Sequence, residues 1–285
     1  MRFVKGHGTG NDFVILPDPS GELELSAELV RRLCDRQFGI GGDGVLRVVR
    51  TAAARGDADG QAAEWFMDYR NADGSVAEMC GNGIRVFAKY LMEAGLASGP
   101  VVQVATRAGT RSVRAGDDGQ FTVDMGPATV VGSGSVEAGG QTFSGLAISV
   151  GNPHVACMVD QPVADIDLSR PRVLAPAEFA AGANVEVVRA TDPREIEMRV
   201  HERGSGLTLS CGTGAVAAAV AAAVAAGEWP DGPDLPWAVQ VPGGRLSVLP
   251  SSTASLLTGP AEIVGAGELS ANWLADLSPV GLATS

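Results

Sequence analysis

The sequence predicts a mixed α/β protein, of the α+β kind, built from two similar halves. Three observations predict it: a polar loop with one cysteine occurs twice, a run with helical character follows each loop, and a short apolar strand and a glycine turn follow each run. The 285 residues exceed the usual size of one core, and 45% hydrophobic residues suffice to fill two. We therefore expect two domains, one around each cysteine.

The first cysteine loop, residues 71–85, brings Cys80 to the start of a predicted helix. Ile84, Phe87 and Leu91 recur at helical spacing, and Gly95 stands where a C-terminal cap belongs. A thiol at a helix N-terminus lies near unpaired N–H groups and the positive end of the helix dipole, which stabilise a thiolate. Cys80 is therefore a candidate acid–base group.

The second cysteine loop, residues 201–214, repeats this arrangement. Cys211 follows Glu202 by nine positions, as Cys80 follows Asn71, and an alanine-rich run then predicts a buried helix. The sequence Val-Gln-Val follows each helix as a strand. If two such halves pack face to face, their helix N-termini point two thiols at one cleft.

The other elements of the first half are predicted from shorter patterns. Ser26 is a candidate cap for a helix to about residue 37, which places Cys34 in the core. A surface excursion is expected over residues 51–62. Strands are expected at residues 2–5, 13–16, 45–49, 64–69 and 120–125.

The second half begins after a stretch with little pattern. Residues 126–145 are predicted to be an irregular crossing between the halves. Cys157 lies in the middle of an apolar strand and is expected to be packed. Strands are expected at residues 146–150, 155–159, 185–189 and 195–200, with a short helix near 177–181. The expected domains are 1–125 and 126–257, followed by a tail, 268–285, with no strong pattern and expected mobility.

Composition excludes several classes of function. A net charge of −12 argues against nucleic acid or an anionic membrane as partner. No apolar run approaches the roughly 20 residues of a membrane span, and the first residues do not resemble a signal peptide. Four cysteines without a C-x-x-C pair indicate neither a disulfide framework nor a zinc site. We expect a cytoplasmic protein that binds a small molecule.

Two thiols from opposite halves suit one reaction in particular. Inverting a carbon whose proton is poorly acidic is simplest with a base on one face and an acid on the other. One cysteine is then a thiolate and the other a thiol, and the two titrate as a pair. Helix N-termini supply N–H donors to a substrate carboxylate, here from Gly81, Asn82, Gly212 and Thr213.

With these motifs, the sequence resembles the diaminopimelate epimerase family. The matching motifs, which include Cys-Gly-Asn-Gly-Ile-Arg and Cys-Gly-Thr-Gly, follow the family order over about residues 1–265. They lie at residues 5–14, 39–44, 71–75, 80–85, 151–154, 202–206 and 211–214. Each motif is weak alone, whereas the ordered set is specific. Val86 replaces a further cysteine that is common in the family and is not one of the two catalytic thiols.

The resemblance implies the activity and the site. It implies a cofactor-independent enzyme that interconverts LL- and meso-2,6-diaminopimelate in lysine and peptidoglycan precursor biosynthesis, with Cys80 and Cys211 as the acid–base pair. Glu202 would take an ammonium group and Arg203 the distal carboxylate. Asn11, Asn71, Asn152 and Asn184 would hold the zwitterion.

The resemblance also implies the fold and the assembly. Each of two pseudo-symmetric domains would be a mostly antiparallel sheet wrapped around a central helix, and a late strand near residues 258–267 would return to the first domain. A homodimer is expected.

The sequence alone leaves further functions open. A related two-cysteine racemase could act on proline or hydroxyproline, although Glu202 and Arg203 suit a second charged end better. A redox protein with a switchable disulfide and a non-catalytic amino-acid-binding module also stay open. None of the three histidines has metal-ligand spacing with another, so no metal is expected, and His154 is the one expected to lie beside the pocket.

Overall fold

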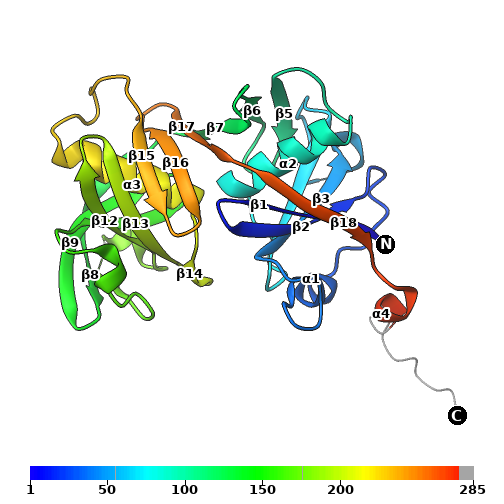
Figure 1. Cartoon of the computed structure of the whole chain (residues 1–285), viewed down its shortest axis with the longest axis horizontal. Coiled ribbons are helices and arrows are strands. Elements are labelled where there is room, and N and C mark those ends of the chain that lie inside the picture. Colours follow the sequence, from blue (N-terminus) through cyan, green and yellow to red (C-terminus); the bar gives the residue numbers. More distant parts are fainter. Residues whose placement is uncertain (55, 175, 276–285) are drawn as a thin grey trace, which may run out of the picture. The chain divides into compact units, whose positions relative to one another are not determined.

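Two units of the chain each contain one of the cysteine loops. The first comprises Met1–Gly8, Asp12–Ser112 and the chain from Ala261, and the second comprises Thr9–Asn11 and Val113–Pro260. The structure is a computed structural model that describes residues 1–54, 56–174 and 176–275 (Figure 1).

The sheet of the first unit surrounds one helix. Its strands pair in the order β18, β1, β2, β3, β4, and β5 follows β4 in parallel. Helix α2, Gly81–Glu93, packs against β1, β3, β4, β5 and β18. The strands are β1 Arg2–Gly8, β2 Asn11–Pro17, β3 Gly44–Arg50, β4 Trp65–Asn71, β5 Val101–Ala105 and β18 Glu262–Glu268.

The second unit has the same organisation on a larger scale. Helix α3, Gly212–Ala225, packs against β9, β10, β12, β13, β15, β16 and β17. Those strands are β9 Gln141–Ser149, β10 Pro153–Met158, β12 Asn184–Asp192, β13 Glu195–Glu202, β15 Trp237–Val241, β16 Gly244–Leu249 and β17 Ser255–Pro260. The other strands of the described chain are β6 Arg111–Ala115, β7 Gln120–Gly126, β8 Thr129–Ala138, β11 Arg172–Leu174 and β14 Gly206–Thr208. Position 125, the sequence-based boundary, lies in β7, which pairs with β17.

Strand pairing confirms the internal repeat. In the first unit, β2 and β3 are parallel, β3 and β4 antiparallel, and β4 and β5 parallel. In the second unit, β10 and β12, β12 and β13, and β13 and β15 show the same three relationships in the same order. The cysteine helix follows the third strand of each set. The predicted α+β class, with a sheet wrapped around a central helix in each half, is confirmed.

The small side chains of α3 explain how it lies at the centre of a sheet. Its sequence is Gly-Thr-Gly followed by alanine and valine, and nearly every residue is buried. Alanine has the highest helix propensity and the smallest helix-compatible side chain, so strands can approach on all sides.

Helix α1, Ala27–Cys34, is shorter than predicted. Ser26 caps it as expected, its Oγ accepting the N–H of Leu29 at 3.2 Å. The helix ends early because the Asp35 carboxylate accepts the N–H groups of Gln37 and Phe38, at 2.8 and 2.7 Å, and so turns the chain. Cys34 lies in the core with Leu29 and Leu33, as predicted.

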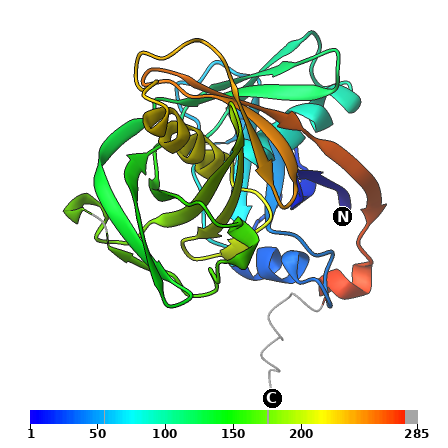
Figure 2. The same ribbon diagram turned by 60° about the vertical axis from the view of Figure 1, so that its left-hand side comes forward.

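The prediction of an irregular crossing at 126–145 is wrong. These residues form most of a long antiparallel hairpin, β8 and β9, drawn in green in Figure 2. Glycine and serine interrupt its apolar pattern for a structural reason: a Cβ on Gly134 would approach Val155 to 3.2 Å. The expected helix near 177–181 is a single 3-10 turn, Ala177–Phe179.

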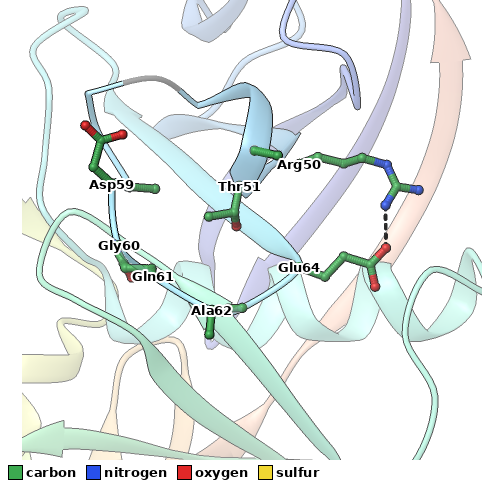
Figure 3. A pocket seen from close by; sticks show the side chains of 10 residues that line it. Arg50, Thr51, Asp59, Gly60, Gln61, Ala62 and Glu64 are labelled. Carbon is green, nitrogen blue, oxygen red and sulfur yellow. Dashed lines mark hydrogen bonds and ion pairs between the residues drawn. The ribbon is translucent and has the colours of Figure 1, made fainter.

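The excursion at 51–62 is docked on its own unit. It begins with a 3-10 turn, Thr51–Ala53, and Arg107 holds it by two bonds to Asp57, at 3.1 and 2.8 Å. It borders a surface pocket of about 440 Å³ together with Arg50, the last residue of β3, and Glu64, which precedes β4 (Figure 3); Arg50 pairs with Glu64 there.

The start of the predicted tail is ordered. Helix α4, Ala271–Ala275, follows β18, and the indole N–H of Trp273 donates to the carbonyl oxygen of Phe38 at 3.0 Å. Residues 276–285 lie outside the described part of the chain. Among the described residues, no helix has the length and apolar character needed to cross a membrane.

Candidate active site

Cys80 caps α2. Its backbone is extended, and its Sγ accepts the N–H of Gly83 at 3.3 Å. The carbonyl oxygen of Cys80 begins the helical ladder by accepting the N–H of Ile84 at 2.9 Å. The sulfur therefore occupies the N-cap position, where side-chain oxygens usually stand, and is half-buried. This confirms the predicted placement of Cys80.

The first turn of α2 is packed against β1. Asn82 is buried, and its Oδ1 accepts a hydrogen bond from the fully buried Arg85 at 3.0 Å. Gly8 permits this packing, since a Cβ there would lie 3.1 Å from both the Arg85 guanidinium and the Asn82 carbonyl oxygen. The orientation of the Gly81 and Asn82 amides therefore depends on a rigid, buried helix start.

The asparagines Asn71 and Asn11 lie at strand ends. Asn71 ends β4, and its side-chain amide donates to Ser75 Oγ at 3.0 Å across the turn. Asn11 begins β2 and is buried, in the short segment that belongs to the second unit. The next residue, Asp12, bonds to Lys5 at 2.6 Å and to Arg36 at 2.7 and 3.0 Å.

Cys211 caps α3 in the same way. Its Sγ accepts the N–H of Gly214 at 3.3 Å and lies 3.5 Å from the hydroxyl oxygen of Thr213. Unlike Cys80, it is buried. Burial, then the charges of Glu202 and Glu186, raise the pKa of the Cys211 thiol well above its usual value, and the Thr213 and Gly214 bonds offset this only in part. Burial is therefore the largest of these influences on the pKa of the Cys211 thiol.

Glu202 ends β13 beside Cys211. Its Oε1 accepts the hydroxyl hydrogen of Thr208 at 2.5 Å, and it also hydrogen-bonds with Cys211. Burial raises the pKa of Glu202, although these two bonds lower it. The second unit therefore places a carboxyl group directly at its thiol.

A chain of hydrogen bonds leads away from Cys211 into the core. The Nδ2 of Asn152 donates to Thr213 Oγ1 at 3.3 Å, and its Oδ1 lies 2.9 Å from His154 Nε2. The Nδ1 of His154 lies 2.7 Å from Glu186 Oε1. The structure thus brings together Asn152, His154, Thr213 and Cys211, all singled out from the sequence.

Asn184 and Arg203 form a second contact of the same unit. The Oδ1 of Asn184 accepts the backbone N–H of Arg203 at 2.9 Å. The Arg203 guanidinium donates to the carbonyl oxygens of Ala181 and Gly182, at 3.4 and 3.3 Å. Asn184 therefore fixes the backbone between the Glu202 and Arg203 side chains.

Two residues of this site were not predicted from the sequence. Glu186 carries a charge within the apolar strand sequence Val-Glu-Val-Val, which was a usable signal. Thr208, on the short β14, gave none.

Solved structures share this fold. A probable proline racemase from Agrobacterium radiobacter aligns with a TM-score of 0.65 over 95% of this chain and 93% of its own, at 16% identity. A PhzF-family protein from Bacillus anthracis aligns with a TM-score of 0.65 over 95% and 99%, also at 16% identity. With its two cysteine-capped helices, the protein is thus of the racemase- and PhzF-like fold class.

Sequence comparison narrows this class. The chain matches the family described as diaminopimelate epimerase over residues 3–131 and 146–264. It is 57% identical to the diaminopimelate epimerase of Thermobifida fusca, over 94% of this chain and 98% of that protein. It is 49% identical to that of Streptomyces coelicolor, over 96% and 97%. The chain belongs to the diaminopimelate epimerase family, whose members are isomerases that act on amino acids.

Proposed function

We propose that this protein interconverts LL- and meso-2,6-diaminopimelate, with Cys80 and Cys211 as the two acid–base groups. The observation that carries the proposal is the repeated cap: each unit presents one sulfur at the N-terminus of its central helix, bonded to the N–H three residues on, at 3.3 Å in both cases. The names of relatives at 57% and 49% identity support the choice of substrate.

The reaction moves one proton in and one proton out. A thiolate takes the α-proton, and the electron pair of the broken C–H bond is delocalised onto the adjacent carboxylate. The other thiol then gives its proton to the opposite face of the same carbon and becomes the thiolate. The N–H groups at the start of a helix stabilise the charge that develops on the carboxylate. No cofactor is needed in this scheme.

Most of the side chains that we propose to contact the substrate belong to the second unit, and Asn71 belongs to the first. Glu202, at the end of β13, takes an ammonium group of the substrate. Arg203, the next residue, takes the distal carboxylate, and Asn11, Asn71, Asn152 and Asn184 contribute amide contacts. A fixed glutamate and a fixed arginine match a substrate with two amino-acid ends better than they match proline. We also propose a homodimeric, cytoplasmic enzyme of lysine and peptidoglycan precursor synthesis.

Proton NMR of LL-diaminopimelate in D₂O tests this function. With reduced protein, free of pyridoxal phosphate, we expect loss of the α-proton signal together with the appearance of the meso isomer. Proline and hydroxyproline are incubated in parallel. Exchange of proline alone would replace the proposal with a racemase, and exchange of no substrate would favour a binding or redox protein.

A further inference from the structure

Glu186 is a buried acid that the mechanism above does not use. The side chains of Glu186 and His154 are both 0% exposed. Its Oε2 is buried and makes no hydrogen bond within the described part of the chain. An acid in an apolar strand is costly to bury unless its charge is compensated. What compensates it is therefore informative.

The hydrogen bonds assign the proton on His154. Asn152 donates from Nδ2 to Thr213 Oγ1, so its Oδ1 faces His154 Nε2. An amide oxygen only accepts, so with the Asn152 amide in this orientation Nε2 carries a hydrogen. The contact of 2.7 Å between Nδ1 and Glu186 then needs one further proton, either on Nδ1 or on the carboxyl group. The pair as a whole has no net charge.

Burial favours the form in which Glu186 and His154 hold the shared proton. If the shared proton left, a neutral imidazole and a carboxylate would put a full negative charge in the core. Burial raises the pKa of Glu186, and its charge and hydrogen-bond interactions with His154 oppose this to a smaller extent. The other titratable groups that interact with Glu186 are Cys157 on β10, Glu202 on β13 and Cys211 before α3, and none of the three is a cation.

The proton shared by Glu186 and His154 affects which hydrogen bond reaches Cys211 Sγ. Because Thr213 Oγ1 accepts from Asn152, its own hydrogen is left to donate to Cys211 Sγ, 3.5 Å away. Without the shared proton, His154 would donate from Nδ1 to Glu186, and Nε2 would accept. Asn152 would then turn its NH₂ group towards His154, and Thr213 would donate to the amide oxygen instead of to the sulfur.

We propose that Glu186 is a positioning residue, whose proton, shared with His154, fixes the orientation of the Asn152 amide and of the Thr213 hydroxyl beside Cys211. The inference rests on the proposed function, because that function makes Cys211 an acid–base group. The orientation itself is independent of that function, and one measurement tests it without substrate.

Nitrogen-15 NMR of the imidazole rings reads the proton directly. The chain has three histidines, so a His154→Gln variant identifies the signals of His154. We expect its Nε2 to carry a hydrogen in the intact protein at pH 7. A neutral ring with hydrogen on Nδ1 alone would overturn the proposal, whether or not the protein is an epimerase.

Activity provides the second readout. Glu186→Gln keeps the shape and one hydrogen bond but removes the acidic proton, so both tautomers of His154 become accessible. We expect both in its spectrum and a fall of about tenfold in kcat/KM, since a misplaced buried donor or acceptor costs on this scale. The matched control is Glu197→Gln, on the neighbouring strand β13, where Glu197 forms a half-buried pair with Arg189 of β12; this variant should stay within about twofold. Wild-type kcat/KM in the Glu186→Gln variant would overturn the proposal. A wild-type protein that exchanges no diaminopimelate proton would instead overturn the proposed function.

Discussion

Gly214 lies directly against the carboxylate of Glu186. A Cβ at position 214 would stand 2.7 Å from Glu186 Oε1 and 3.2 Å from the Cβ of Cys211. The glycine therefore lets the first turn of α3 approach both the buried acid and the thiol. At the equivalent position of α2, a Cβ on Gly83 would meet nothing closer than 3.3 Å.

This difference predicts unequal effects of alanine at the two positions. Gly214→Ala should lower the free energy of unfolding by about 1–3 kcal/mol, the usual cost of overpacking a core, whereas Gly83→Ala should cost less. Urea denaturation followed by circular dichroism measures both. Adding Glu186→Ala should recover part of the loss in the Gly214→Ala variant. Additive losses in that double variant would contradict the assigned contact.

Each of the two capping cysteines should be indispensable to catalysis. In Cys80→Ala and in Cys211→Ala, we expect epimerisation of LL-diaminopimelate to fall by at least about a thousandfold, because a face of the substrate loses its proton donor or acceptor. The measurement is formation of the meso isomer, with circular dichroism to verify folding. Cys34→Ala changes only the core near α1 and should retain activity. Near-normal turnover by either cap variant would eliminate the two-base scheme.

The repeat was the part of the fold most accessible from sequence. The nine-residue spacing before each cysteine and the helical run after it reflect one backbone geometry used twice, and the matching strand pairings bear this out. The β8–β9 hairpin was missed because its apolar periodicity is diluted by glycines such as Gly134, which the close approach of Val155 requires. Apolar periodicity in a sequence indicates which side chains are buried. It therefore misses a strand in which close packing leaves room only for glycine.

The two cysteine caps of the candidate site were predictable from the sequence, and their electrostatics were less so. Cys80 and Cys211 occupy the helix caps that the sequence indicated. Their environments differ because Cys211 is buried and interacts with Glu202 and Glu186, the latter from a strand 25 positions earlier in the sequence. A local sequence pattern identifies a helix cap. The pKa of the thiol at that cap depends also on its burial and on charged neighbours far away in the sequence.

Cysteine reactivity should follow these environments. Burial raises the pKa of Cys34 and of Cys157 to about 12, so at pH 8 only ~0.01% of either thiol is ionised. Cys80 is half-buried at a helix N-terminus. Limited treatment with iodoacetamide at pH 8 should therefore modify Cys80 first and leave Cys34 and Cys157 unmodified, as read by peptide mass spectrometry. The fast-reacting peptide should vanish in Cys80→Ala, and rapid labelling of Cys34 or Cys157 would contradict the structure.

The ion pairs of Asp12 should make stability depend on acid pH. Burial alone would raise the pKa of Asp12, but the hydrogen bonds and charges of Arg36 and Lys5 outweigh it and hold the pKa well below 3.8. A lowered pKa in the folded state means that the carboxylate stabilises the fold at pH values above its unfolded pKa, and that this stabilisation is lost as the pH falls towards the folded pKa.

Asp12→Asn should therefore cost about 1–3 kcal/mol at pH 7, a difference that shrinks below about pH 4. Most of the effect should come through Lys5, whose side chain is 21% exposed, because Arg36 is 59% exposed and solvent screens its charge. Chemical denaturation at several pH values measures the difference. Glu93→Gln is the control and should show little cost at any pH, because the Glu93 carboxylate is 53% exposed and lies 3.7 Å from Lys89 Nζ. A cost for Asp12→Asn that is the same at pH 3 and pH 7 would mean that its carboxylate charge does not stabilise the fold.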